Sequence, residues 1–317
     1  MVNLKINAIV TMPPYAPYID EVLKHRIVSG IRLNTVMPVK GSLEDIVKSL
    51  EGKAKNYGKE LWIDLKCRQL RIKNYGVPPF TEIELTHDIE VTAPVKAYFS
   101  GGKESATVLE TNGNKLIMQD GPRRVVGPGE SINIVDPSLK IIGYLTDTDK
   151  MYVDACLKNN FHSYMLSFVE GKQDIDELHS YDGKANVIAK IESLKGLDYA
   201  LNRWHGECRL MAARGDLYLE LKMPHHIIEA EEKILEKDKN AIVASRLFDS
   251  LSCQLEPSCE DIGDADNLMR MGYKTFMLGD EVCMKRDSII SALNLLEKMS
   301  AKYMSGSCKA PRISNIS

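Results

Sequence analysis

The stretch Val187-Ile188-Ala189-Lys190-Ile191-Glu192 decides the fold, together with the end of the next apolar run and the residues that follow it, Ala212-Ala213-Arg214-Gly215-Asp216. Both runs are typical of strands. Lys190 and Glu192 are two residues apart, so on a strand their side chains point to the same side. Asp216 stands just past the C-terminal end of its run, which is where a barrel of parallel strands keeps its chemistry.

These three side chains suggest a metal site. Two carboxylates can hold one Mg²⁺ in part and leave positions open for substrate oxygens. A nearby ammonium can neutralise charge on a transferring phosphoryl group or an enolate. The competing interpretation is structural, because Lys-x-Glu on a strand is most often a surface ion pair and Arg-Gly-Asp is usually only a turn. The residues around Lys190 are apolar, and a buried charged pair needs a reason to be there, which favours the site.

Outward from this stretch, short apolar runs alternate with longer amphipathic segments. Eight such alternations favour a parallel (β/α)8 TIM barrel of the α/β class over an open sheet. The predicted strands are 6–10, 30–34, 61–65, 163–169, 187–192, 209–213, 241–244 and 275–278. The predicted helices are 18–25, 42–57, 149–159, 174–179, 196–203, 224–236, 261–271 and 287–301.

One long interruption breaks the alternation after the third strand. Short strand-like runs separated by tight-turn residues, such as Asn112-Gly113-Asn114, predict a small β-barrel-like domain inserted there. We therefore expect a first barrel part at 1–71, an inserted β lid at 72–138, a second barrel part at 139–303 and a flexible tail at 304–317. The runs of the insert are 81–85, 95–99, 106–109, 115–118 and 131–135.

Composition narrows the class of protein. The net charge of −3 offers no general reason to expect nucleic-acid binding. No apolar run reaches the roughly 18 residues that span a membrane, and the N-terminus lacks the apolar core of a signal peptide. The 7 cysteines form no Cys-x-x-Cys pair, which is typical of reduced thiols. We expect a cytoplasmic protein.

At this point several motifs, in the right order and spacing, resemble the pyruvate kinase family over nearly the whole chain. The similar segments are Gly30–Asn34, Trp62–Lys66 with Arg71, Leu145–Lys150, Ser167–Val169, Ala189–Glu192, Ala213–Leu217, Glu256–Ser258 and Asp264–Asn267. The family inserts its small β lid after strand three, as expected here, and its effector domain follows the barrel. The chain stops soon after the last barrel helix, so we expect that domain, and control through it, to be absent.

The resemblance implies a role for each matched residue. Glu192 and Asp216 would ligate Mg²⁺ or Mn²⁺, and Lys190 would stabilise the phosphoryl group in flight. Arg32 would contact phosphate, with Arg71 helping on the nucleotide side. The substrates would be phosphoenolpyruvate or pyruvate with ADP or ATP, and a homo-oligomer is left open. Two further roles concern the organic acid: Gly215 and Asp216 would offer backbone N–H groups to its carboxylate, and Ser245 would place its hydroxyl near the enolate carbon.

The sequence also departs from the family pattern on the nucleotide side. Of the four oxygen donors for a monovalent cation, only Asn34 and Asp64 remain, because Val36 and Leu65 replace the other two. This predicts weakened K⁺ binding, and one hypothesis is that Arg68 supplies a fixed charge instead. The remaining departures include Val36-Met37-Pro38, Tyr218, Arg246 and Gly279-Asp280-Glu281-Val282.

Three hypotheses follow. The first is a minimal phosphotransferase of pyruvate kinase type. The second is a metal-dependent lyase or aldolase that acts on a pyruvate-type enolate and ignores nucleotide. The third is a non-catalytic homologue that binds an oxo acid, and the intact Lys190, Glu192 and Asp216 argue against it.

Overall fold

The computed structural model describes residues 5–78 and 82–304. Parallel strands close into a barrel, which confirms the predicted fold class, and neighbours around it follow the order β1, β15, β14, β13, β12, β11, β3, β2. Pairing of β1 with both β2 and β15 closes the circle. The strands are β1 (Asn7–Thr11), β2 (Val28–Asn34), β3 (Glu60–Leu65), β11 (Ser163–Leu166), β12 (Asn186–Ile191), β13 (Arg209–Ala213), β14 (Ile242–Ala244) and β15 (Thr275–Leu278).

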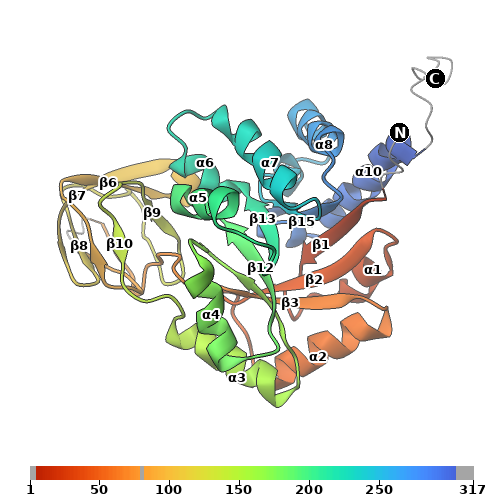
Figure 1. Cartoon of the computed structure of the whole chain (residues 1–317), viewed down its shortest axis with the longest axis horizontal. Helices are drawn as coiled ribbons and strands as arrows, with labels where there is room; N and C mark the ends of the chain where they lie inside the picture. Colours follow the sequence, from red (N-terminus) through yellow and green to blue (C-terminus); the bar gives the residue numbers. More distant parts are fainter. Residues whose placement is uncertain (1–4, 79–81, 305–317) are drawn as a thin grey trace.

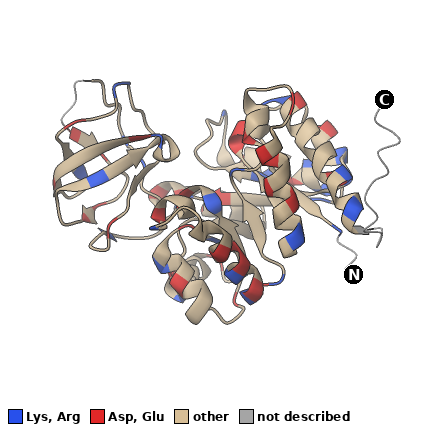
Figure 2. Cartoon of the chain, turned by 90° about the horizontal axis from the view of Figure 1, so that it is seen from above, with Lys and Arg blue, Asp and Glu red and all other residues tan. Residues whose placement is uncertain are grey.

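Helices surround the barrel on its outside (Figure 1). They are α1 (Ile19–Lys24), α2 (Leu43–Asn56), α3 (Asp147–Lys158), α4 (Lys172–Tyr181), α5 (Leu194–Asn202), α6 (Arg214–Glu220), α7 (His226–Lys237), α8 (Cys259–Met271), α9 (Asp280–Cys283) and α10 (Arg286–Met304). Within the described part of the chain, none of them has the length and apolar character needed to cross a membrane. In Figure 2, acidic and basic residues are interspersed along these helices.

Burial on both faces explains why the barrel strands are continuous apolar runs. In β12, every residue from Val187 to Ile191 is buried. The barrel interior is filled by bulky side chains that include Trp62, Met165 and Met211. A larger core lies between the strands and the helices. Because both cores exclude water, the polar residues of these strands lie toward the strand ends, and Arg32, Asp64 and Lys190 lie toward the C-terminal ends.

Side-chain caps set where several helices begin. Ser42 accepts a hydrogen bond from the backbone N–H of Asp45 at the start of α2. At the start of α3, Thr146 and Asp149 form a reciprocal capping box. Each cap satisfies a backbone donor that the first helical turn leaves without a partner. Capping at Thr146 also explains why α3 begins at Asp147, two residues earlier than predicted.

A β unit, called the lid below, interrupts the barrel between β3 and α3. Its main antiparallel sheet has the order β4, β8, β7, β6, β9, and a second pair joins β5 to β10. It has a hydrophobic core of its own. Antiparallel pairing begins at the Arg71–Ser131 bridge and extends to Ile141 in β10. The strands are β4 (Glu82–Glu84), β5 (Ile89–Glu90), β6 (Val95–Phe99), β7 (Glu104–Asn112), β8 (Lys115–Met118), β9 (Ile132–Ile134) and β10 (Lys140–Ile141), with the short helix η1 (Ser100–Gly102).

The lid touches the barrel at α6 (Figure 1). A Cβ on Gly102 of η1 would lie 2.5 Å from Leu219 Cδ2, so the two elements approach closely. The predicted domain limits at 71, 138 and 303 remain predictions. Met304 belongs to α10, and the remainder of the expected tail lies outside the described residues.

Candidate active site

The predicted site residues gather at the C-terminal ends of the barrel strands. The strands that carry them belong to one continuous part of the closed barrel, in the order β13, β12, β11, β3, β2. The residues are Arg32 and Asn34 on β2, Asp64 on β3, Lys190 at the end of β12, Glu192 directly after it, and Gly215 and Asp216 in the first turn of α6. The barrel closure thus brings together side chains that are far apart in the sequence.

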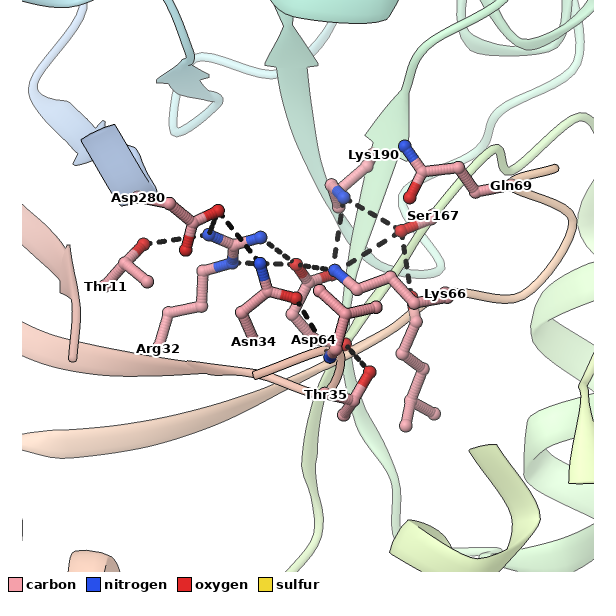
Figure 3. Close-up of polar contacts among 12 residues, drawn as sticks. Thr11, Arg32, Asn34, Thr35, Asp64, Lys66, Gln69, Ser167, Lys190 and Asp280 are labelled. Atoms are coloured by element: carbon pink, nitrogen blue, oxygen red, sulfur yellow. Dashed lines mark hydrogen bonds and ion pairs between the residues drawn. The ribbon is translucent and has the colours of Figure 1, made fainter. Parts of the chain in front are cut away.

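Asp64 is the centre of a buried charge cluster (Figure 3). Its carboxylate accepts hydrogen bonds from Arg32 Nε and Lys66 Nζ, each at 2.7 Å. Lys190 Nζ lies 3.3 Å from its other oxygen. Burial raises the pKa of Asp64, but the three cations outweigh burial and hold that pKa well below its usual range. Asp64 is therefore an anion at neutral pH that neutralises part of the positive charge at the mouth.

The cluster also shifts the pKa values of its two lysines, Lys66 and Lys190, in opposite directions. Burial and the charges of Arg32 and Lys190 lower the pKa of Lys66 to about 7. The negative charge of Asp64 opposes this shift. Burial also acts to lower the pKa of Lys190, but Asp64 and Glu192 outweigh it and raise that pKa. Lys190 is therefore a fixed positive charge, whereas the ammonium of Lys66 loses its proton more easily than that of an exposed lysine.

Lys190 and Glu192 meet as their spacing predicts. Lys190 Nζ lies 3.2 Å from Glu192 Oε1 and donates to Ser167 Oγ at 2.8 Å. Both side chains are buried, with 5% and 3% of the residue exposed, which excludes the surface ion pair that was the competing interpretation. Burial and the nearby charge of Asp216 raise the pKa of Glu192, although Lys190 opposes them.

The Asp216 carboxylate connects the barrel to the lid. Asn133 on β9 donates to Asp216 Oδ1 at 2.8 Å. Gln69, in the connection that leads into the lid, donates to Oδ2 at 3.3 Å. Asn133 is itself buried, with 6% of the residue exposed. One of the two predicted metal ligands is thus in direct hydrogen-bond contact with the lid.

The donor set fits Mg²⁺ better than a cation that needs a full protein cage. Across the described residues, no group of three or more His, Cys, Asp or Glu side chains is arranged to hold a metal. Glu192 and Asp216 provide two carboxylates whose charges disfavour each other, and a divalent cation would relieve this. Mg²⁺ is commonly held by one or two carboxylates, with water and substrate oxygens completing its shell.

Arg71 is a cation of the site whose hydrogen bonds are incomplete within the described residues. It donates to the Gly129 carbonyl and to Gln69 Oε1. Its Nε is buried without a hydrogen-bond partner in the described part of the structure. Burial lowers the pKa of Arg71, and no carboxylate forms an ion pair with it among the described residues. A buried N–H donor without a partner is costly, and an anion bound at the mouth would satisfy it.

The predicted monovalent-cation ligands are engaged elsewhere. Asn34 Nδ2 donates to Asp280 Oδ2 at 2.9 Å, and Asn34 Oδ1 faces the Val36 backbone N–H at 3.4 Å. Asp64 is surrounded by three cationic side chains, as described above. Arg68 does not lie on Asp64 and instead donates to both carboxylate oxygens of Asp174, at 2.6 and 3.0 Å. The hypothesis that Arg68 takes the place of K⁺ is therefore wrong.

Arg32 is more fully paired than its predicted role suggests. Besides Asp64, its guanidinium donates to Thr11 Oγ1 at 2.8 Å and lies 3.5 Å from Asp280 Oδ2. One oxygen of Asp280 is buried without a partner within the described residues. A phosphate at Arg32 would have to compete with Asp280, so Arg71 is the more available anion ligand.

Ser245 lies against the start of α6. A Cβ on Gly215 would lie 3.4 Å from Ser245 Cβ, so the small residue at position 215 allows the loop after β14 to approach. Ser245 and Arg246 both have positive φ angles, 69° and 54°. Arg214 holds this loop by donating to the carbonyls of both residues, at 3.0 and 2.8 Å.

Sequence reasoning missed several residues of this site. Lys66 follows Asp64 by two positions, the same spacing that identified Lys190 and Glu192, so that signal was present. Asn133 carried no local signal, because only the folded lid brings it to Asp216. Asp280 was noted only as a departure from a pattern, and its contacts with Arg32 and Asn34 depend on the closure of the barrel.

Together these features define a class: a closed (β/α)8 barrel with a β lid after its third strand and a carboxylate and lysine site beneath the lid. The sequence profile described as "Pyruvate kinase, barrel domain" matches residues 57–286. The chain belongs to the pyruvate kinase family.

Individual relatives agree with this assignment. The chain is 24% identical over 298 residues to a pyruvate kinase of Methanocaldococcus jannaschii, covering 87% of this chain and 65% of the relative. It is 24% identical over 302 residues to a pyruvate kinase of Thermoplasma acidophilum, covering 88% and 54%. The chain therefore spans between about half and two thirds of the length of these relatives.

A solved structure supports the fold. The crystal structure of a pyruvate kinase from Cryptosporidium parvum superimposes with a TM-score of 0.72, covering 94% of this chain and 69% of that chain. The sequence identity is 18%, so this likeness concerns the fold alone.

Proposed function

We propose that the protein is a Mg²⁺-dependent phosphotransferase of pyruvate kinase type that acts on phosphoenolpyruvate or pyruvate and a nucleotide. One observation carries the proposal: the Glu192 and Asp216 carboxylates, the fixed charge of Lys190 and the incompletely paired Arg71 share one barrel mouth beneath a lid. Phosphoryl transfer requires positioning and neutralisation of charge more than covalent chemistry. The site contains groups for both tasks.

Each residue has a distinct task in this proposal. Glu192 and Asp216 would hold Mg²⁺, which when bound supplies positive charge to substrate oxygens. Lys190, fixed between Asp64, Glu192 and Ser167, keeps its ammonium at the reacting phosphoryl group. Arg71 would use its free Nε to bind a phosphate oxygen.

The substrate acid would lie next to Gly215 and Asp216. Ser245 is in contact range of Gly215 and presents a hydroxyl at this side of the mouth. The lid, held through Asn133, would exclude water, which would otherwise accept the phosphoryl group. We further propose that turnover does not need K⁺, because three cations already neutralise Asp64.

The test is release of pyruvate from phosphoenolpyruvate and ADP with Mg²⁺ or Mn²⁺, with and without K⁺. Turnover that is independent of K⁺ and is abolished in Lys190→Met is the expected result. Lys48→Gln, which removes an exposed charge on α2, is the matched control and should be fully active. Absence of turnover in a preparation that still binds Mn²⁺ and pyruvate would refute the phosphotransferase assignment and favour enolate chemistry without nucleotide.

A further inference from the structure

Arg246 is a cation at the barrel mouth that the proposed function does not use. It is exposed, and in the described residues no carboxylate oxygen lies within ion-pair distance of it. Other arginines of the mouth are held by carboxylates, for example Arg32 by Asp64 and Arg68 by Asp174. The charge of Arg246 acts on Asp249. Burial, Glu281 and Asp261 raise the pKa of Asp249, and the positive charge of Arg246 opposes this rise.

The loop that carries Arg246 is fixed rather than free. Ser245 and Arg246 both have left-handed backbone conformations, which non-glycine residues keep only where the surrounding structure enforces them. Buried Arg214 stabilises this conformation through the carbonyls of both residues. Arg214 is in turn anchored by Asp264 at 2.7 Å and Glu231 at 3.2 Å. The loop is therefore built to hold the side chain of residue 246 in one place.

An aromatic ring supports the guanidinium. Its central carbon lies 4.3 Å from the centre of the Tyr218 ring. Tyr218 is three residues after Gly215 on α6, so both occupy the same face of that helix, the face against which Ser245 packs. In a stacked guanidinium the flat face contacts the ring. The N–H groups at its edge stay free to form bidentate hydrogen bonds with an anion.

We infer that Arg246, supported by Tyr218, binds a second carboxylate, so that the site prefers a dicarboxylic 2-oxo acid or its enol over pyruvate itself. This inference rests on the proposed function and on the role that the resemblance implies for Ser245, whose hydroxyl would lie near the enolate carbon. A substituent on that carbon would extend past Ser245 to the next residue of the loop, Arg246. With Lys190, and Mg²⁺ if bound, at one end of the acid and Arg246 at the other, the mouth would select for an acid with a negative charge at each end.

The experiment measures the affinity of the Mn²⁺-loaded protein for five acids by calorimetry. Pyruvate tests the basic site, oxaloacetate and 2-oxoglutarate carry the second carboxylate, and 2-oxobutyrate and 2-oxopentanoate have chains of matching length without it. We expect at least a tenfold preference for one dicarboxylate over its uncharged partner. Arg246→Gln should reduce that preference to less than twofold.

Two control variants separate recognition from general charge. Tyr218→Phe keeps the stacked ring and should keep the preference. Lys48→Gln removes a positive charge from the exposed face of α2 and should also keep it. A preference that persists in Arg246→Gln would overturn the inference, and so would loss of preference in Lys48→Gln, because the effect would then be one of net charge.

The outcomes also distinguish this inference from the proposed function. Pyruvate binding that depends on Mn²⁺, without any preference for a dicarboxylate, overturns the inference and leaves the proposed function standing. Failure of all five acids to bind in the presence of Mn²⁺ overturns both.

Discussion

The hydrogen bond from Asn133 to Asp216 is one of the contacts between the lid and the barrel, and we predict that its loss favours the open lid. Asn133 Nδ2 donates to the carboxylate at 2.8 Å, and Asn133 is almost fully buried. A hydrogen bond to a charged group contributes about 1.5–3 kcal/mol, and 1.4 kcal/mol is about a factor of ten in an equilibrium constant. Asn133→Ala should therefore shift the balance between closed and open lid by about 10- to 100-fold toward the open state.

Lid position can be measured as a distance between two spin labels by double electron–electron resonance. Exposed positions 96, on β6 of the lid, and 48, on α2 of the barrel, are suitable for the labels. Cys253 and Cys259, which are exposed in the described part of the chain, and Cys308, which lies outside it, are first replaced by serine. The native protein should give one short distance population, and Asn133→Ala should add a longer and broader one.

Asn114→Ala is the matched control for this experiment. Its amide donates to Glu84 and to the Leu85 carbonyl, and both partners lie within the lid. This variant loses a lid hydrogen bond without touching the barrel, so its distance distribution should match that of the native protein. If Asn133→Ala also matches the native protein, the Asn133–Asp216 bond does not hold the lid and the reasoning fails.

Three further predictions concern metal binding, pH and packing. Mn²⁺ at 100 times its dissociation constant should stabilise the native protein against thermal unfolding by about 2.7 kcal/mol; Glu192→Gln should lose most of this shift, and an undiminished shift would remove Glu192 from the metal site. Glu220 lines the cavity between lid and barrel, and burial raises its pKa to about 7. The folded state then binds more protons than the unfolded state between about pH 4.5 and 7, so stability falls as pH rises through this window. Glu220→Gln should therefore melt higher than the native protein at pH 8 and at the same temperature at pH 4, and equal melting temperatures at both would contradict the shift. Gly102→Ala should force η1 away from Leu219, because the new Cβ would lie 2.5 Å from Cδ2 at a φ of 89°; the same label distance should lengthen, and an unchanged distance would show that Leu219 yields instead.

Local patterns in the sequence predicted most of the barrel. The strands Arg209–Ala213 and Thr275–Leu278, and Val95–Phe99 in the lid, have the bounds that were predicted. These segments carry their signal in their own residues, as apolar runs or alternation between turn residues. The two-residue strands β5 and β10 were not predicted, because each exists only through pairing with the other.

The same distinction holds for the site. Two-residue spacing on a strand was enough to bring Lys190 and Glu192 together, because side chains on a strand alternate between its faces. It could equally have identified Lys66 beside Asp64. No local rule links Asn133 with Asp216, Asp280 with Arg32, or the Arg246 guanidinium with the Tyr218 ring.

The sequence by itself thus determined the class of fold, the insertion of the lid and the chemical character of the strand ends. It did so because helix and strand periodicities, turn residues and burial are local properties of the chain. Only the tertiary structure decided which charges meet: that Arg32, Lys66 and Lys190 share Asp64, that Arg71 keeps a free donor, and that the lid rests on Asp216. Barrel closure and lid placement bring these groups within a few ångströms of one another. At that distance their interactions determine the charge of each group and the partner it bonds to. This proximity depends on the packing of the whole chain and not on any local pattern.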